Sequence, residues 1–392
     1  MNSVTPPGDT SDLVVIGGGV IGLSIAWECA RAGMSVRLLD RDEPGRAASW
    51  AGAGMLPPGA RTADFSALPA SARPEAALRT LSASFWPDHV ASLRDAVDLD
   101  VGYRRHGAVH LFEDEGARDA AASRLTAQRI GHKKFDESGP TRPGHGGYFR
   151  NGIAVPDQAQ VRNPRLLKAL RIACERAGVS IVPQAAVHDF RRAGDRLTAA
   201  VTDAGDFAAG HFCLAAGVWS GRLAATLGPP PPVEPVRGQI ALLKFPAPPF
   251  AETVEVGKRY LVPRDDGRLL VGATEERAGF AAETTAGALA DLLAFAARVF
   301  PAAASATLER HWAGLRPGSP DGLPFLGPVP DAANAVFAAG HFRNGLQQSP
   351  ATAVLVRELL TGRRPSIDLT PYAADRHVVP RVTPFVPEDR SH

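Results

Sequence analysis

A glycine-rich turn between two apolar runs constrains this chain more than any other feature of its sequence. The run DLVVIG (12–17) is short, rich in β-branched residues and typical of a strand that is buried on both faces. It leads into Gly17, Gly19 and Gly22, which satisfy the pattern G-x-G-x-x-G ahead of a helical apolar period. Gly17 permits a tight turn, Gly19 lets the backbone approach a pyrophosphate, and Gly22 lets the helix pack on the strand. The spacing predicts the first strand, turn and helix of a Rossmann-like domain.

The second apolar run, SVRLLD (35–40), ends in an acid that completes this motif. Asp40 follows Gly22 by 18 residues and can accept hydrogen bonds from a ribose 2′-hydroxyl, while the helix N-terminus stabilises the diphosphate. The same carboxylate would repel the 2′-phosphate of NADP. These residues predict a dinucleotide site, and they leave NAD and FAD both open.

Composition and cysteine usage argue against several other classes of function. The formal net charge is +2 with no basic stripe or acidic tail, so we expect no nucleic-acid or membrane-surface partner. The chain has no run of about 18 apolar residues, and residues 1–11 lack the basic and apolar regions of a signal peptide. Cys29, Cys174 and Cys213 stand far apart in apolar contexts, which favours reduced, buried thiols in a cytoplasmic protein over disulfides. We expect no metal site, and homo-oligomerisation stays open.

Two kinds of secondary-structure pattern alternate along the chain and predict two interleaved domains. Strand–helix alternation begins at the N-terminus and returns after residue 150. Strand-like alternation around an expected turn at His106-Gly107 marks LDVGYRRHGAVHLFEDE (99–115) and predicts an antiparallel sheet there, and it returns in VEPVRGQIALLKF and RYLVPRDDGRLLVGAT. We therefore expect an α/β fold with the ligand cleft between its two domains. The dinucleotide-binding domain takes residues 1–85, 150–225 and 311–392, and a smaller antiparallel-sheet substrate-binding domain takes residues 86–149 and 226–310.

The polar run GHFRNGLQQSPATA (340–353) lies between a buried strand pattern and a helical one. A loop that only connects these elements would not need so many hydrogen-bonding groups, whereas a site for a large, flat, polar ligand would. Ser349-Pro350 is a helix-start signature, so we expect the helix to begin there.

Several segments together resemble the D-amino-acid oxidase superfamily of FAD enzymes: DLVVIGGGVIGLSIAWECARAG, HFCLAAGVWS, RYLVPRDDGRLLVGAT, GLRPGSPDGLPFLG and AAGHFRNG. The pairing of GLRPGSPDG with AAGHFRNG is similar to the glycine oxidase branch, the flavoenzymes of thiamine biosynthesis. The resemblance covers nearly the whole chain. It implies FAD rather than NAD, and no cysteine between residues 316 and 350 is placed to attach the flavin covalently.

The resemblance also implies the residues of the site. Arg316 matches the arginine that binds the substrate carboxylate, and Tyr260 matches a substrate-contacting tyrosine. Met55 and Arg343 complete the expected substrate site, and Arg316, Tyr260 and Arg343 are its expected catalytic residues. The family usually has aliphatic residues where Gln347, Gln348 and Ser349 stand, and we expect Gln347 to bond the pyrimidine edge of the flavin with Gln348 behind it. The expected cofactor-binding residues are Gly17, Gly19, Val20, Ile21, Gly22, Asp40, Arg41, Ala48, Ser49, Ala53, Gly54, Met55, Val187, His341, Phe342, Arg343, Asn344, Gly345, Leu346 and Gln347.

The implied activity is oxidative deamination of glycine, sarcosine or a small D-amino acid to the imine or 2-oxo acid, with dioxygen reduced to peroxide. Two alternatives are a dehydrogenase that passes electrons to another acceptor and a flavin-bound assembly factor with little turnover. Arg316 argues against the assembly factor, because a scaffold needs no carboxylate clamp. Each side chain also has a plain structural alternative: Arg316 as the tie of a Pro/Gly turn, Tyr260 as a strand aromatic, and Arg343 as an ion-pair residue.

Overall fold

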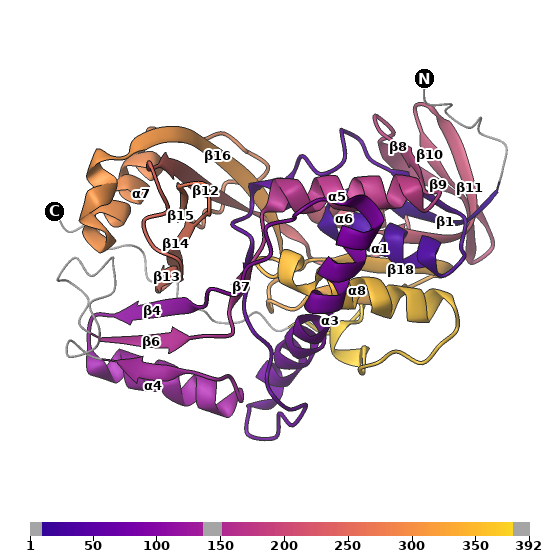
Figure 1. Ribbon diagram of the computed structural model, residues 1–392. Coiled ribbons are helices and arrows are strands. Elements are labelled where there is room, and N and C mark those ends of the chain that lie inside the picture. Colours follow the sequence, from indigo (N-terminus) through magenta and orange to yellow (C-terminus); the bar gives the residue numbers. More distant parts are fainter. Residues whose placement is uncertain (1–9, 136–150, 379–392) are drawn as a thin grey trace.

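The computed structural model describes residues 10–135 and 151–378, and its helices and strands form two lobes (Figure 1). The Gly/Pro-rich segment expected at 139–147 lies outside the described residues, as does most of the N-terminal segment considered for a signal peptide. Each lobe is built on one large sheet.

The sheet of the first lobe is mostly parallel, and the strand before the glycine turn lies inside it. Four fully or almost fully buried residues alternate along that strand: Leu13 and Val15 point to one face, Val14 and Ile16 to the other. A strand covered on both faces needs a continuous apolar run, as this one has. The strand order is β17 (Phe325–Val329), β18 (Ala332–Ala339), β11 (Gly205–Leu214), β1 (Ser11–Ile16), β2 (Val36–Leu39) and β8 (Ser180–Val182), and the strands β9 (Val187–Ala193) and β10 (Arg196–Thr202) extend from β11.

Helices from distant parts of the chain cover one face of this sheet (Figure 1). They share a core with Leu13 and Val15, whereas Val14 and Ile16 pack on the opposite side with β9, β10 and α6 (Ser220–Ala224). The covering helices are α1 (Val20–Arg31), α3 (Arg73–Val97), α5 (Asn163–Arg176) and α8 (Gly345–Leu360).

The second lobe is a mostly antiparallel sheet with α7 (Ala286–Val299) packed on one face. Leu292, Phe295 and Val299 of this helix are buried against the sheet. A further helix, α4 (Glu115–Ala127), lies beside the far end of the sheet (Figure 1). The strand order is β16 (Thr307–Gly318), β12 (Glu234–Lys244), β15 (Arg268–Gly272), β14 (Arg259–Pro263), β13 (Thr253–Val256), β4 (Ala108–Phe112), β6 (Asn151–Val155) and β5 (Lys133–Phe135).

The expected fold class is confirmed: a Rossmann-like α/β lobe is interleaved with an antiparallel-sheet lobe. The strands and helices differ from the expected domain limits at three places. Helix α3 runs through the limit at 85/86 and packs with the first lobe, since its Trp86 and Leu93 belong to that core. Strands β6 and β16 lie in the second sheet, although residues 150–225 and 311–392 were expected in the first domain.

The antiparallel sheet expected around 99–115 is present: β4 begins directly after His106-Gly107 and pairs antiparallel with β6 and parallel with β13. One local expectation is wrong. Helix α8 begins at Gly345, so Pro350 lies inside the helix and not at its start. Proline has no N–H for the carbonyl of Leu346, and the Ser349 hydroxyl donates to that oxygen instead (2.9 Å). This substitute donor lets the helix continue through the proline.

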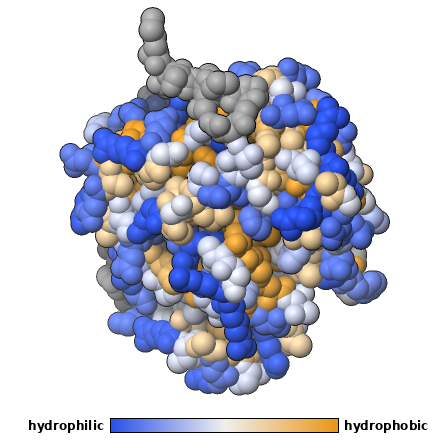
Figure 2. Space-filling view, turned by 90° about the vertical axis from the view of Figure 1, so that its right-hand side faces the viewer, coloured by the Kyte–Doolittle hydropathy of each residue, from blue (hydrophilic) through white to orange (hydrophobic). Residues whose placement is uncertain are grey.

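On the face shown in Figure 2, hydrophilic side chains surround a narrow band of hydrophobic ones. Within the described residues, no helix combines the length and apolar character that crossing a bilayer requires. Cys29, Cys174 and Cys213 are buried and unpaired, as expected.

Candidate active site

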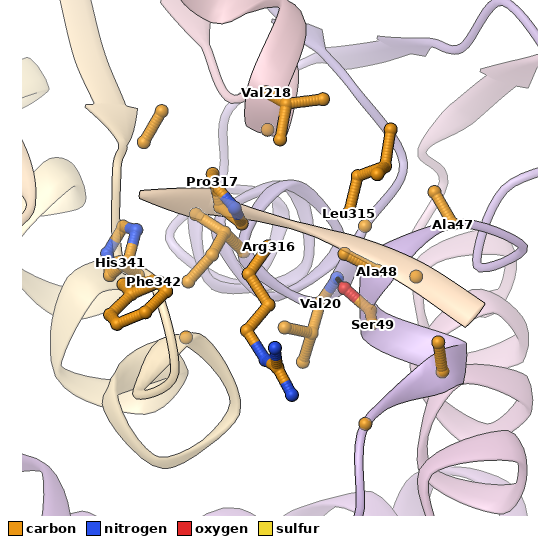
Figure 3. A pocket seen from close by; sticks show the side chains of 18 of the residues that line it. Val20, Ala47, Ala48, Ser49, Val218, Leu315, Arg316, Pro317, His341 and Phe342 are labelled. Atoms are coloured by element: carbon orange, nitrogen blue, oxygen red, sulfur yellow. Dashed lines mark hydrogen bonds between the residues drawn. The ribbon is translucent and has the colours of Figure 1, made fainter. Parts of the chain in front are cut away.

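A cavity of about 1680 Å³ extends from the glycine turn of the first lobe to the inner face of the second sheet. This volume exceeds the roughly 300–1,000 Å³ of common ligand pockets, so it can hold a dinucleotide and a small substrate together. Every expected site residue lines it except Gly22, which lies behind the turn. Figure 3 shows Arg316 reaching from β16 into the cavity, with His341 and Phe342 on one side and Val20 and Ser49 on the other.

The turn between β1 and α1 leaves no space for side chains. Gly17 has a φ of +108°, and a Cβ atom there would lie 2.4 Å from the carbonyl oxygen of Ala215. A Cβ atom on Gly22 would lie 1.8 Å from the carbonyl oxygen of Gly17. The close approach of helix to strand that these glycines predicted is therefore present, and the start of α1 faces the cavity.

Asp40 closes this turn from the end of β2. Its Oδ2 accepts the N–H of Gly18 (2.5 Å) and its Oδ1 accepts the N–H of Asp42 (2.9 Å). Burial raises the pKa of Asp40 from its ordinary value, and the two backbone donors act in the opposite direction. A carboxylate has about four acceptor positions, so this one retains capacity for a hydroxyl of a bound ribose.

A segment that contains α2 (Ala48–Ala51) and β3 (Met55–Leu56) passes along the cavity after this turn. Donors from outside the segment bind four of its carbonyl oxygens. Asn163 Nδ2 donates to Ser49 O (2.8 Å) and Trp312 Nε1 donates to Ala51 O (3.1 Å). Arg264 Nη2 donates to Ala53 O (2.6 Å), and the Val161 N–H donates to Gly54 O (2.8 Å). The path of this segment is thus set by its surroundings.

Arg316 and Tyr260 lie together on the inner face of the second sheet. Two glycines make room for them, because a Cβ atom on Gly238 would lie 2.2 Å from Arg316 Nη1 and one on Gly272 would lie 2.4 Å from the Tyr260 ring. Arg316 Nη1 donates to Thr274 O (3.0 Å). Among the described residues, no carboxylate forms an ion pair with Arg316. Its guanidinium can therefore accept a carboxylate from a ligand.

Burial shifts the acidity of both groups. It lowers the pKa of Arg316, and it raises the pKa of Tyr260 against the opposing effect of the Arg316 and Arg343 charges. Tyr260 accordingly stays a neutral phenol near neutral pH and can donate a hydrogen bond.

Arg343 lies at the rim of the same cavity with charged neighbours. Its Nη2 donates to Lys258 O (3.1 Å), and its Nη1 lies 3.6 Å from a carboxylate oxygen of Glu275. Lys258 Nζ lies 3.1 Å from the other oxygen of Glu275. The structure thus shows Arg343 as an ion-pair residue that also faces the cavity.

The segment from His341 to the first turn of α8 forms another wall. His341 is buried, its Nε2 lies 3.0 Å from Thr352 Oγ1, and burial lowers its pKa to about 3. The imidazole is therefore neutral. No side chain caps α8 at Asn344, so the free N–H groups and the positive end of the helix dipole lie beside the cavity at Gly345 and Leu346.

Comparisons with known proteins agree with this geometry. A family model described as FAD dependent oxidoreductase matches residues 12–359. This chain belongs to that family. Glycine oxidase from Pseudomonas aeruginosa is 38% identical over 362 residues, which are 92% of this chain and 98% of that protein. The crystal structure of glycine oxidase from Geobacillus kaustophilus has a TM-score of 0.87 at 30% identity and covers 94% of this chain and 100% of its own. Iminodiacetate oxidase from Chelativorans sp. BNC1 has a TM-score of 0.82 at 26% identity, covering 92% and 98%.

The cofactor of this FAD-dependent oxidoreductase is FAD, as expected, and the walls of the cavity fit it. The glycine turn and the start of α1 would hold the diphosphate, and Asp40 the ribose. Arg41 and Val187 line the cavity on the adenosine side, where the Arg41 guanidinium carbon lies 3.5 Å from the centre of the Trp219 ring. The start of α8 would face the flavin ring.

The structure gives Gln347 more than one contact. It lines the cavity, yet its Nε2 donates to Arg79 O on α3 (2.9 Å), while its buried Oε1 has no hydrogen-bond partner within the described part of the chain. Its backbone carbonyl accepts from Ser82 Oγ (2.6 Å) and Trp86 Nε1 (2.9 Å). Gln347 therefore joins α3 to the cavity wall, and the neighbouring Gln348 is also buried.

Sequence reasoning missed several residues that shape the site: Asn163, Trp219, Arg264 and Trp312. Two of them had a recognisable signal. Arg264 is a charged residue within the apolar strand pattern RYLVPR, and Trp312 stands on the strand that leads to Arg316. Asn163 precedes Pro164 and showed only the start of a helix. Its amide is instead used to hold the cavity-lining segment.

Proposed function

We propose that this FAD-dependent oxidoreductase deaminates glycine or another small amine-bearing acid, such as sarcosine or a small D-amino acid, and passes the electrons to dioxygen. One observation carries the proposal. Among the residues that the structure describes, no carboxylate pairs with the Arg316 guanidinium, which faces the cavity that the expected FAD-binding residues line. A substrate carboxylate would supply the missing partner.

In this proposal, Arg316 and Tyr260 bind the carboxylate and so fix the position of the α-carbon and its amine. Met55 and Arg343 border the remaining space. Bound FAD supplies the two-electron acceptor for the Cα–H bond. Burial lowers the pKa of His341 to about 3, so this imidazole is too weak a base to take a proton from the substrate ammonium, and the amine would arrive neutral. The imine then reacts with water to give a 2-oxo acid and ammonia, or methylamine when the substrate is sarcosine.

Relatives and cysteine chemistry support two parts of the proposal. The names of the compared proteins, glycine oxidase and iminodiacetate oxidase, both describe oxidation of a small acid that carries an amine beside a carboxylate. The three buried, unpaired cysteines support a reducing, cytoplasmic location.

A substrate panel tests the proposal. Purified holoenzyme is assayed for peroxide with glycine, sarcosine, D-alanine and L-alanine, with and without an artificial electron acceptor. We expect peroxide from the first three and none from L-alanine, whose α-hydrogen would point away from the flavin. The kcat/KM values should fall gradually with the size of the substrate, because one methylene changes the free energy of transition-state binding by about 1–3 kcal/mol. Turnover that requires the artificial acceptor would show that the protein is a dehydrogenase and not an oxidase. No turnover with any of the amino acids would overturn the proposal.

A further inference from the structure

Arg264 directly follows β14 in the second lobe. Its side chain contacts the segment 49–55, which lines the cavity and is called the FAD-facing segment below. Arg264 is 8% exposed. Its Nη1 donates to Gln160 Oε1 (2.6 Å) and Val161 O (3.0 Å), and its Nη2 donates to Ala53 O (2.6 Å). These acceptors belong to the segment along the cavity and to the short strand β7 (Ala159–Gln160), which pairs with β3.

We propose that Arg264 is a positioning residue that sets the distance between the substrate-binding strand and the FAD-facing segment 49–55. That Tyr260 on β14 binds the substrate rests on the proposed function. That Arg264 holds the FAD-facing segment rests only on the contacts of Arg264.

One face of β14 carries both ends of this connection. Side chains alternate along a strand, so Tyr260, Val262 and Arg264 share a face. Tyr260 lines the cavity beside Arg316. Val262 belongs to the same apolar cluster as Ala53, and Arg264 binds the carbonyl oxygen of Ala53. A rigid strand therefore holds the substrate tyrosine at one point and the FAD-facing segment a few residues further on.

The charges around Arg264 show that ion pairing does not explain its burial. Its described hydrogen-bond acceptors are all neutral oxygens, and burial lowers its pKa to about 10. The adjacent acids have other partners: Asp265 pairs with Arg104 (2.8 Å), and Asp266 pairs with Arg162 and with Arg268 (2.8 Å).

A well-packed apolar side chain is often as stabilising as a buried charge. The planar fork of a guanidinium, however, holds three oxygens in fixed directions, whereas an apolar side chain holds none and the ammonium of a lysine offers three donors on a single freely rotating atom. The guanidinium therefore provides geometry: it fixes Ala53 O relative to Gln160 and Val161.

The chain offers a matched control on the next strand. Arg268 bonds Glu309 and Asp266 within the second lobe, and no described contact joins it to residues 49–55. Arg268→Met removes the same charge from the same hairpin without touching the FAD-facing segment.

The experiment compares Arg264→Met, Arg264→Lys and Arg268→Met as FAD-loaded enzymes. We measure the visible spectrum and midpoint potential of the bound flavin, kcat and KM for the best amino acid, and the thermal midpoint. Arg264→Met should shift the flavin spectrum and lower kcat by roughly 10–100-fold with a smaller change in KM, because the reacting groups are displaced. Arg264→Lys should recover part of the loss, and Arg268→Met should match the parent in spectrum and kcat.

Arg264→Ala adds a rescue test. Guanidinium ion at millimolar concentration should restore part of the parent spectrum and kcat. If Arg264→Met binds FAD with the parent spectrum, potential and kcat, the proposal is wrong, even if its thermal midpoint is lower. If Arg264→Met does not fold, an Arg264→Lys enzyme with the parent spectrum and kcat contradicts the proposal equally. The spectrum and potential need no substrate, so they test Arg264 separately from the proposed reaction.

Discussion

Replacing Arg316 by alanine tests the centre of the proposed site. In the structure one guanidinium nitrogen, Nη1, already donates to Thr274 O (3.0 Å), which leaves the remaining N–H groups for a ligand. A hydrogen bond to a charged group contributes about 1.5–3 kcal/mol. Two such bonds to a carboxylate, less the water contacts that replace them, correspond to a loss of about 2–4 kcal/mol, or roughly 10²–10³ in kcat/KM.

The assay is steady-state peroxide formation over a range of glycine concentrations, after equal FAD loading has been confirmed by absorbance. We expect Arg316→Ala to raise KM and to lower kcat, because the clamp both binds the substrate and orients its α-carbon. Arg316→Lys should recover only part of the activity, since an ammonium cannot reproduce the planar fork.

The control is Arg268→Ala, which removes an arginine of the second lobe that bonds Glu309 and Asp266 away from the cavity. Its kcat/KM should equal that of the parent. If Arg316→Ala loses less than about tenfold in kcat/KM while keeping its FAD, Arg316 is a structural residue of its turn and the substrate binds elsewhere.

Four further outcomes follow from the structure. Asp40→Ala should weaken FAD binding measured by fluorescence, because the carboxylate supports the Gly18 turn as well as the ribose; unchanged affinity would contradict both roles. Denaturant should release the FAD, since all three cysteines are buried away from any attachment, and yellow colour that stays with the unfolded chain in gel filtration would disprove this. Gln347→Leu should shift the flavin spectrum and lower the thermal midpoint by removing the bond to Arg79 O; an unchanged spectrum with an altered substrate ranking would place Gln347 in the substrate pocket. Burial lowers the pKa of His341 to about 3, so the unfolded chain binds a proton there below about pH 6.5 while the folded chain does not. The contribution of His341 to stability in urea should then fall as pH drops from 6.5, by up to about 1.4 kcal/mol per pH unit, and His341→Gln should reduce the measured slope by that amount. The slope that remains includes the contribution of His89, whose pKa burial lowers to about 4.

Local sequence determined the first two strands of the FAD-binding lobe and the turn and helix between them. The strand at Val14, the turn at Gly17 and the acid at Asp40 lie within about thirty residues. This spacing is typical of the first strand–helix–strand unit of a Rossmann-like fold. Steric exclusion explains why. The carbonyl oxygens around Gly17 and Gly22 approach so closely that only glycine fits, so the pattern of residues carries the geometry directly.

Periodicity was less informative where a side chain replaces a backbone partner or where strands pair at a distance. Pro350 looked like a helix start, but the Ser349 hydroxyl supplies the donor that proline lacks. The strand before Arg316 looked like a return to the first domain, but β16 pairs along β12 in the second sheet. Neither contact follows from the alternation of apolar residues alone.

The sequence by itself predicted a dinucleotide site and, through its family motifs, nearly all of the expected residues that the structure places around one cavity. Only the tertiary structure decided how the site is held together. Arg264 reaches Ala53 across 211 positions of the chain, and Gln347 reaches Arg79 across 268. Such bonds depend on how two sheets and their helices pack, because a donor finds its acceptor only after both elements are in place. A local pattern specifies each element, whereas the packing of distant elements specifies the partners of its polar side chains.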